Sequence, residues 1–230
     1  MPTRRAGIAR DAFTARRRAP LNRGAILEAA ISMADEDGLE AVTMRRLGQR
    51  VGVEAMSLYK HVSDKDDVLA GIADRVAGEF VIPSRETDWR DSLRASYLAA
   101  HQVLMRHPWA ASLLESTLQP GPARLAYLEA VVGVLHDAGF NLLDVAHAFG
   151  ALDSHLYGFT LQATSLPFDV SEAPETAAAL AEALPPEQFP NLIAMASMVA
   201  EADDGYPLDF TFGLDLLLDG LARRLASQAT

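Results

Sequence analysis

Hydrophobic residues recur every three or four positions along most of the chain, and proline and glycine divide this recurrence into segments. Runs that alternate apolar and polar residues never extend beyond a few positions, which argues against strands. The pattern therefore predicts an all-α fold. We expect helices over residues 22–38, 43–52, 54–62, 64–80, 88–107, 122–139, 141–162, 175–184, 191–202 and 208–225.

Residues typical of helix ends mark several of these boundaries. Side chains that can accept hydrogen bonds from a first helical turn stand at Asn22, Thr43, Ser63 or Asp64, Asp88 and Asn141. Glycines that suit a left-handed residue after a helix stand at Gly38, Gly52 and Gly139. Residues 163–190 hold five of the twelve prolines, which predicts a long mobile connection around the short helix 175–184.

Charge is distributed unevenly along the 230 residues, whose net charge is −11. Residues 1–70 carry twelve Lys and Arg against ten Asp and Glu, whereas residues 71–230 carry eight against twenty-one. We therefore expect a basic flexible arm (1–20), a small helical domain (21–70) and a larger acidic domain (71–230). The arginines of the arm either contact DNA phosphates or form a solvated tail, and composition leaves both open.

Three short helices follow one another in residues 21–70, and the second and third are joined through Gly52 and Val53. This spacing matches a helix-turn-helix, whose third helix enters the major groove. The third segment keeps Leu58 and Val62 for the interior and presents the mixed polar and methyl groups that base recognition needs. These candidates are Ala55, Met56, Ser57, Tyr59, Lys60 and His61, with Thr43, Arg45, Arg46 and Lys65 placed to hold phosphates. A plain helical hairpin that never touches DNA is the alternative.

The same region resembles a known family. Over residues 25–72, the runs Val42-Thr43-Met44-Arg45-Arg46-Leu47, Val51-Gly52-Val53 and Leu58-Tyr59-Lys60-His61-Val62 look like the TetR-type DNA-binding domain. The resemblance implies that Thr43, Arg45, Tyr59 and Lys65 contact the DNA backbone. It also implies that Ala55, Met56, Ser57, Lys60 and His61 face the bases.

The resemblance extends more weakly into the larger domain. Trp89 with Leu93-Arg94, Ala138-Gly139-Phe140 and the closing run 212–221 are similar to the C-terminal domain of the tetracycline repressor branch. That similarity implies a homodimer with a four-helix interface, here roughly 142–162 and 208–225. Gly150 and Gly158 would permit close helix approach, and the Leu-rich last helix suits a core shared between subunits. A monomer core is the alternative, since apolar stripes serve both purposes.

By the same resemblance, a pocket for a small-molecule effector should lie within residues 89–162. Its candidate residues are His101, Met105, Trp109, Asp153, His155, Tyr157 and Phe159. Each of them also has an ordinary interpretation as a core or surface residue. The segment 109–115 lacks the histidine that holds a metal-bound drug in tetracycline repressors, so we expect a ligand other than tetracycline with magnesium.

Other classes receive little support. The absence of cysteine excludes disulfides, thiolate zinc sites and a catalytic thiol. The six histidines lack the spacing of a helical metal site. We therefore expect no metal or other cofactor. Because no glycine-rich phosphate loop, nucleophile elbow or defensible catalytic pair is found, an enzyme is disfavoured, although a helical enzyme or lipid-binding module is the alternative class. No apolar run approaches the roughly 20 residues that cross a bilayer, and we expect a cytoplasmic protein.

These observations predict a ligand-responsive transcriptional regulator. We expect a homodimeric repressor whose two recognition helices enter successive major grooves of a palindromic operator until a small molecule releases it. An activator, or a regulator without a ligand, is not excluded by the sequence.

Overall fold

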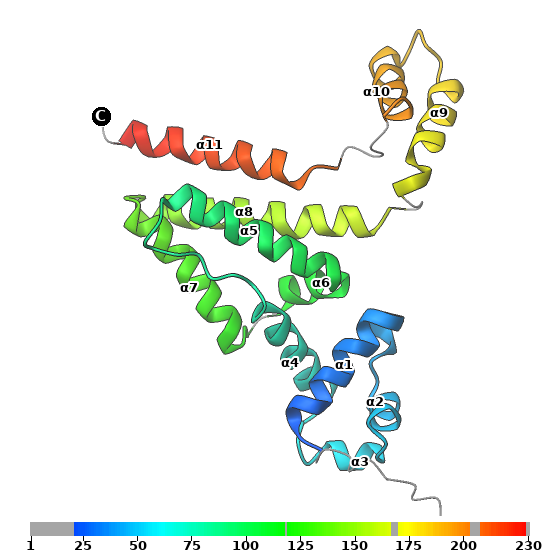
Figure 1. Cartoon of the computed structure of the whole chain (residues 1–230), viewed down its shortest axis with the longest axis vertical. Helices are drawn as coiled ribbons and strands as arrows, with labels where there is room; N and C mark the ends of the chain where they lie inside the picture. The colour runs from blue at the N-terminus through cyan, green and yellow to red at the C-terminus, as the bar shows by residue number, and fades with distance from the viewer. Residues whose placement is uncertain (1–20, 118, 167–169, 203–207, 229–230) are drawn as a thin grey trace, which may run out of the picture.

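The computed structural model describes residues 21–117, 119–166, 170–202 and 208–228. These residues form eleven α-helices and no strand, as the periodicity predicts (Figure 1). The helices are α1 (Arg23–Asp37), α2 (Met44–Val51), α3 (Ala55–Leu58), α4 (Lys65–Ala77), α5 (Trp89–Arg106), α6 (Pro108–Ser116), α7 (Pro122–Asp137), α8 (Leu142–Thr164), α9 (Ala173–Ala183), α10 (Pro190–Ala200) and α11 (Phe210–Gln228). The predicted basic arm, residues 1–20, lies outside the described residues.

Polar side chains cap the helices where the sequence predicts. Asn22 and Asn141 each accept a hydrogen bond from the backbone N–H three residues on, at 2.9 and 3.0 Å. Of the two candidates before α4, Asp64 is the cap, and its carboxylate accepts from the N–H of Asp67 at 2.8 Å. Because the first N–H groups of a helix have no partner within it, these side chains fix where α1, α4 and α8 begin.

Two helices differ from the prediction. The third helix is a single turn that ends at Leu58, and the chain then continues as a turn in which the N–H groups of His61 and Val62 donate to the Leu58 carbonyl. The step His107-Pro108 predicts only the end of α5, but Pro108 also begins α6. Proline both ends a preceding helix and suits the first position of a new one, because that position needs no N–H donor.

Helices α1 to α3 form a small unit at one end of the molecule, and α4 leads from it into a body of α5, α6, α7, α8 and α11 (Figure 1). One apolar cluster runs through both parts. Its members include Ile26 of α1, Ile72 of α4, Leu104 of α5 and Leu152 of α8, none of which has exposed surface. The small unit and the body are therefore packed together through α4.

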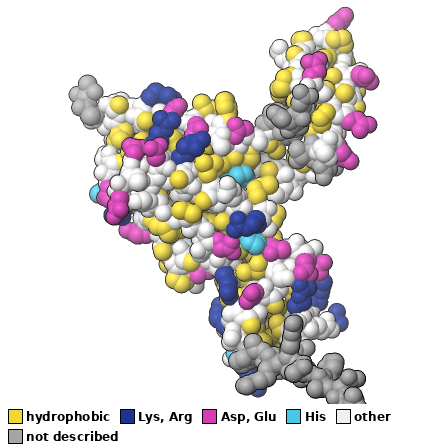
Figure 2. Space-filling model, in the orientation of Figure 1, with side chains coloured by type: hydrophobic (Ala, Val, Ile, Leu, Met, Phe, Trp, Pro, Cys, Tyr) yellow, Lys and Arg dark blue, Asp and Glu magenta, His cyan; other side chains and the backbone are white. Residues whose placement is uncertain are grey.

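Helices α9 and α10 form a hairpin that projects from the body (Figure 1). They pack against each other through Ala177, Ala196 and Val199, a small cluster separate from the main core. Helix α9 is the short helix predicted over 175–184, and the connection around it is shorter than predicted, because α8 continues to Thr164 and α10 begins at Pro190. The visible surface of the hairpin is apolar and acidic (Figure 2).

No helix among the described residues combines the length and the apolar character that crossing a membrane requires.

Candidate nucleic-acid interface and effector pocket

The turn between α2 and α3 is built on two glycines. Gly52 ends α2 in the left-handed region, at φ 76° and ψ 37°. Gly48 lies so close to the next segment that an added Cβ would be 2.9 Å from the carbonyl oxygen of Val53. With Leu47 and Leu58 fully buried between the two helices, this close crossing fixes how α3 is presented to its surroundings.

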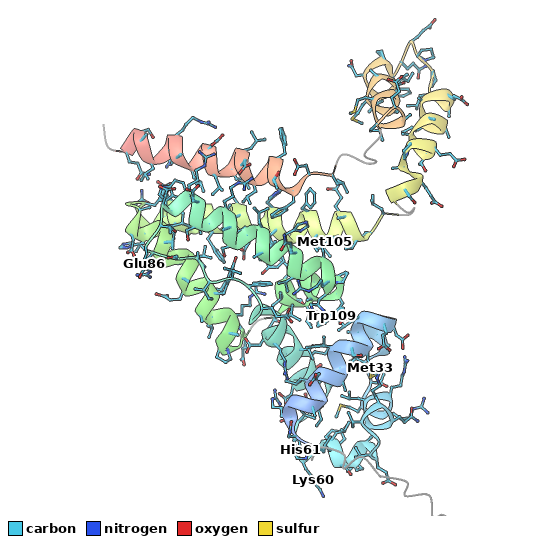
Figure 3. All side chains as sticks on the ribbon, viewed as in Figure 1. Met33, Lys60, His61, Glu86, Met105 and Trp109 are labelled. Atoms are coloured by element: carbon cyan, nitrogen blue, oxygen red, sulfur yellow. The ribbon has the colours of Figure 1, made fainter. Side chains whose placement is uncertain are left out.

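The outward face of α3 and of the turn after it carries the residues predicted to meet bases. Its exposed members are Met56, Tyr59, Lys60 and His61, and its half-buried members are Ala55 and Ser57. Met56 is 73 % exposed and Tyr59 45 % exposed, so neither side chain contributes much to the core. Lys60 and His61 lie at the end of the molecule remote from the body (Figure 3). Leu58 and Val62 are buried beneath, which confirms the predicted division of this segment into two faces.

The predicted phosphate-holding residues lie on the flanks of this face. The Thr43 hydroxyl accepts from the N–H of Arg46 at 3.3 Å and so caps α2, which leaves its own proton for a further acceptor. Arg45 is exposed and pairs with none of the described residues. Arg46 forms an ion pair with Asp37 at the end of α1. Lys65 is the first residue of α4 and is half-buried.

Three of the predicted effector residues gather around Phe210, the first residue of α11. The imidazoles of His101 and His155 both stack on its ring, with centroids 4.2 and 4.7 Å away, and Phe159 meets it edge-on at 5.4 Å. His155 also contacts the Phe210 carbonyl oxygen through Nε2 at 2.9 Å. Burial lowers the pKa of His101, and the neighbouring His155 lowers it further. The cluster joins α5, α8 and α11.

Two more predicted residues belong to a buried polar cluster between α5, α7 and α8. The carboxylate of Asp153 accepts a hydrogen bond from the hydroxyl of Tyr97 at 2.9 Å. Burial raises the pKa of Asp153 to about 6, although the Tyr97 hydroxyl and the nearby charge of Arg124 act in the opposite direction. The ring of Tyr157 has the guanidinium carbon of Arg124 5.6 Å from its centroid. Burial raises the pKa of the Tyr157 hydroxyl as well.

The last two predicted residues lie elsewhere. Trp109 lies between α6 and α1 (Figure 3), where its indole N–H donates to the carboxylate of Asp35 at 2.7 Å. The same oxygen contacts Nδ1 of His107 at 2.8 Å. Trp109 therefore joins the small unit to the body. Met105 is 43 % exposed on the surface of α5.

Sequence reasoning missed the residues that complete these clusters. Neither Tyr97 nor Arg124 was among the predicted site residues, and a single arginine in a first helical turn is usually solvent-exposed. Asp35 and Asp74 were missed because their partners lie far away along the chain. The partners of Asp35 are 72 and 74 residues away, and the partner of Asp74 is 50 residues away. Local patterns carry no signal for such pairs.

A third surface lies on α8 and α11. The outward side of α8 presents a stripe of mostly small residues, namely His147, Gly150, Ala151, Ser154 and Gly158. A Cβ added to Gly150 or Gly158 would meet nothing within 4 Å. Beside this stripe, Phe212 and Leu216 of α11 are 68 % and 55 % exposed. A cavity of about 580 Å³, lined by residues of both helices, opens on this side. Such a surface is atypically apolar for exposed helices.

Two family profiles match the chain. The family described as "Bacterial regulatory proteins, tetR family" matches residues 26–72, and the one described as "Tetracyclin repressor-like, C-terminal domain" matches residues 82–225. Together they cover both the helix-turn-helix unit and the body.

Individual proteins are similar over nearly the whole length. An HTH-type transcriptional regulator of Saccharopolyspora erythraea is 36 % identical over 203 residues, 88 % of this chain and 85 % of that protein. The tetracycline repressor protein class D of Escherichia coli is 30 % identical over 214 residues, 91 % of this chain and 93 % of the repressor. The structure of the TetR family protein ActR of Streptomyces coelicolor, in complex with actinorhodin, is 25 % identical with a TM-score of 0.76, and the match covers 90 % of this chain and 99 % of ActR.

Proposed function

The chain belongs to the TetR family of bacterial transcriptional regulators, and from this premise we propose that it is a homodimeric repressor that a small molecule releases from a palindromic operator. The observation that carries the proposal is the outward face of α3, where Met56 and Tyr59 are exposed beside Lys60 and His61 at the free end of the molecule. Large apolar side chains exposed beside a lysine and a histidine are costly in water, and this mixture suits contacts with base edges and phosphates.

In this proposal the segment 55–61 enters the major groove. Lys60 donates to guanine acceptors, and Met56 offers an apolar contact for a thymine methyl group. Ala55, Ser57 and His61 complete the face toward the bases. The backbone-holding set is Thr43, Arg45, Arg46, Tyr59 and Lys65. We expect Arg46 to contribute less to phosphate binding than Thr43 and Arg45, because a phosphate contact would compete with its ion pair to Asp37.

The second copy docks through α8 and α11. The small residues Gly150, Ala151 and Gly158 let a partner helix approach closely, and Phe212 and Leu216 supply apolar surface that is exposed in a single chain. A two-fold dimer built on this face, at the end of the body remote from α3, would carry its two α3 segments on one side. Two such segments match the two half-sites of a palindrome.

The effector binds in the interior of the body and acts through α4. Support comes from the polar cluster around Asp153 and Tyr157, and from ActR, a related regulator whose structure contains actinorhodin. Helix α4 packs on the body and continues into the unit that carries α3. A ligand that shifts α4 changes the separation of the two α3 segments and weakens contacts at both half-sites.

Selection of bound fragments from random DNA, with the mass of the same sample measured in solution, tests this function. We expect an enriched palindrome and a mass of twice 24.8 kDa. A folded dimer that enriches no sequence at low salt, after any bound ligand has been removed by unfolding and refolding, would contradict it.

A further inference from the structure

Arg124, the third residue of α7, has side-chain nitrogen atoms without a hydrogen-bond partner among the described residues. Its Nε and Nη1 atoms are buried, and among the described residues they are the buried side-chain nitrogen or oxygen atoms that lack a hydrogen-bond partner. A guanidinium keeps its charge throughout the physiological pH range, so it does not escape burial by losing a proton. A buried charge without a partner is strongly unfavourable. The described residues thus provide no acceptor for these two atoms, although the charge of Arg124 is felt by the nearby carboxylate of Asp153.

The contact that Arg124 does make leaves its N–H groups free. The guanidinium carbon lies 5.6 Å from the centroid of the Tyr157 ring, a cation–π arrangement. Such a contact engages the electron-rich face of the ring, whereas the N–H groups of a guanidinium require acceptors at its edge. Asp153, one turn before Tyr157 on α8, is already bonded to the hydroxyl of Tyr97.

Space for a ligand opens beside Tyr157. A cavity of about 220 Å³ is lined by Glu115, Ser154, Tyr157, Gly158 and Leu161, and it opens on the outward side of α8, next to the surface that we propose for the second copy. Tyr157 is thus in contact with both the Arg124 guanidinium and this cavity. The rings of Tyr97 and Tyr127 lie further into the same body, with centroids 6.4 Å apart. Neither of them lines the cavity, whose aromatic side chain is Tyr157, and its ring favours a flat, aromatic ligand.

We infer that the effector is an aromatic carboxylic acid whose carboxylate pairs with the guanidinium of Arg124. The inference rests on the proposed function, because it assigns the chemistry of the effector. A carboxylate oxygen is a strong acceptor for a guanidinium N–H, and either unpartnered nitrogen, Nε or Nη1, can donate to it. The carboxylates of Asp153 and Glu115 lie in the same region, so a singly charged carboxylate is accepted more readily than a doubly charged phosphate group.

The position of Arg124 also connects this ligand to α4. The backbone N–H of Arg124 donates to the carboxylate of Asp74 on α4 at 3.0 Å. A carboxylate that pulls on the Arg124 side chain therefore acts on the same turn of α7 that holds α4. Because α4 leads into the unit that carries α3, acid recognition is transmitted toward the DNA-contacting face.

Calorimetric titration of the full chain without DNA tests the inference. The probes are benzoate, 1-naphthoate and 2-anthracenecarboxylate, each compared with the neutral alcohol of the same ring system. At least one acid should bind about tenfold more tightly than its alcohol, and Arg124→Gln should remove that preference. The matched variant Arg85→Gln changes an exposed arginine that pairs with Asp137 and should retain the preference. An absence of acid preference across the panel, or acid binding that survives R124Q, overturns the inference.

A second measurement needs no probe. Arg124→Met keeps much of the side-chain length but removes the N–H groups, so the unliganded R124M protein should unfold at or above the wild-type temperature. A clearly lower temperature for R124M, with R85M unchanged, would mean that the guanidinium is a structural group and would overturn the inference. If the protein binds the acid but selects no DNA, the proposed function is wrong and the acid site stands. If it selects DNA but shows no preference for an acid, the acid site is wrong and the proposed function stands.

Discussion

The carboxylate of Asp74 on α4 caps the first turn of α7, because its Oδ1 accepts a hydrogen bond from the backbone N–H of Arg124 at 3.0 Å. Helix α7 has no side-chain cap of its own, since its N-cap residue is Gly121. A Cβ added to Gly121 would lie 2.3 Å from the Asp74 carboxyl carbon, so a side chain at this position would displace the Asp74 carboxylate. The helix that joins the two parts of the protein is therefore held directly by the helix that carries Arg124.

Removal of this cap should loosen α4 from the body. We expect Asp74→Ala to lower the free energy of unfolding by about 1 kcal/mol, as loss of a helix cap does, while Asp74→Asn retains most of the stability because an amide oxygen still accepts the bond. Chemical denaturation measures both. Glu129→Ala, which removes an exposed carboxylate of α7, is the control and should have little effect. Equal stability of D74A and E129A would contradict the assigned role of Asp74.

The hydrogen bond from Trp109 to Asp35 should stabilise the contact between α6 and α1. Trp109→Phe keeps one aromatic ring but removes the pyrrole part with its N–H donor, and we expect loss of the hydrogen bond to cost about 1–2 kcal/mol because the acceptor is a carboxylate. The control is Trp89→Phe, which changes the second tryptophan, whose ring packs edge-on against Phe140 at 5.4 Å. Thermal unfolding of both variants separates the lost hydrogen bond from lost packing. If W89F costs as much as W109F, the bond to Asp35 contributes nothing specific.

The face of α8 and α11 should hold two copies together. Leu216→Glu places a charge in the middle of the proposed interface, so the mass in solution should fall from about twice 24.8 kDa to 24.8 kDa at micromolar concentration. Leu125→Glu alters an equally exposed leucine of α7 and should leave the dimer intact. Light scattering after size-exclusion chromatography measures the mass of both variants in solution. A dimer that tolerates L216E would place the interface elsewhere.

The buried carboxylate of Asp153 should make stability depend on pH. Its pKa is raised from 3.8 to about 6 in the folded protein, so the folded state binds the proton more tightly than the unfolded state between these values. The free energy of unfolding should therefore fall as pH rises from about 4 to about 6 and change no further through this group above that range.

Asp153→Asn removes this dependence, because the amide is neutral and its oxygen still accepts from Tyr97. At pH 7.5 we expect D153N to be more stable than the wild type by at most about 3 kcal/mol, and near pH 4 the two should be equal. Urea unfolding at the two pH values measures the difference. Asp66→Asn, at an exposed carboxylate, is the control. A D153N protein that is less stable than the wild type at pH 7.5 would show that the ionised carboxylate is favoured.

The helices could be predicted from the sequence because their determinants are local. Asn22, Thr43 and Asn141 cap the helices they immediately precede, and the division of the α3 segment into an outward face and buried Leu58 follows from helical spacing. Helix α6 was missed because proline was interpreted only as a terminator, although Pro108 both ends one helix and starts the next.

The interior site could be predicted only in part. His101 and His155 were both assigned to one candidate pocket, and both stack on Phe210, a residue 55 positions beyond His155 that the sequence did not single out. Trp109 was a pocket candidate by the family resemblance, and in the structure its indole N–H donates to Asp35 of α1. Pairings between helices distant in sequence depend on packing, which no local pattern encodes.

The placement of the recognition face is tested most directly by the double variant Tyr59→Ala, Lys60→Ala. Fluorescence anisotropy on the selected operator, with thermal unfolding in parallel, should show an affinity loss of about a hundredfold and an unchanged unfolding temperature, because both side chains are exposed. Arg85→Ala, which removes one positive charge from the body, should leave the affinity nearly unchanged. Operator affinity that survives the double variant would mean that another surface of the protein contacts the DNA.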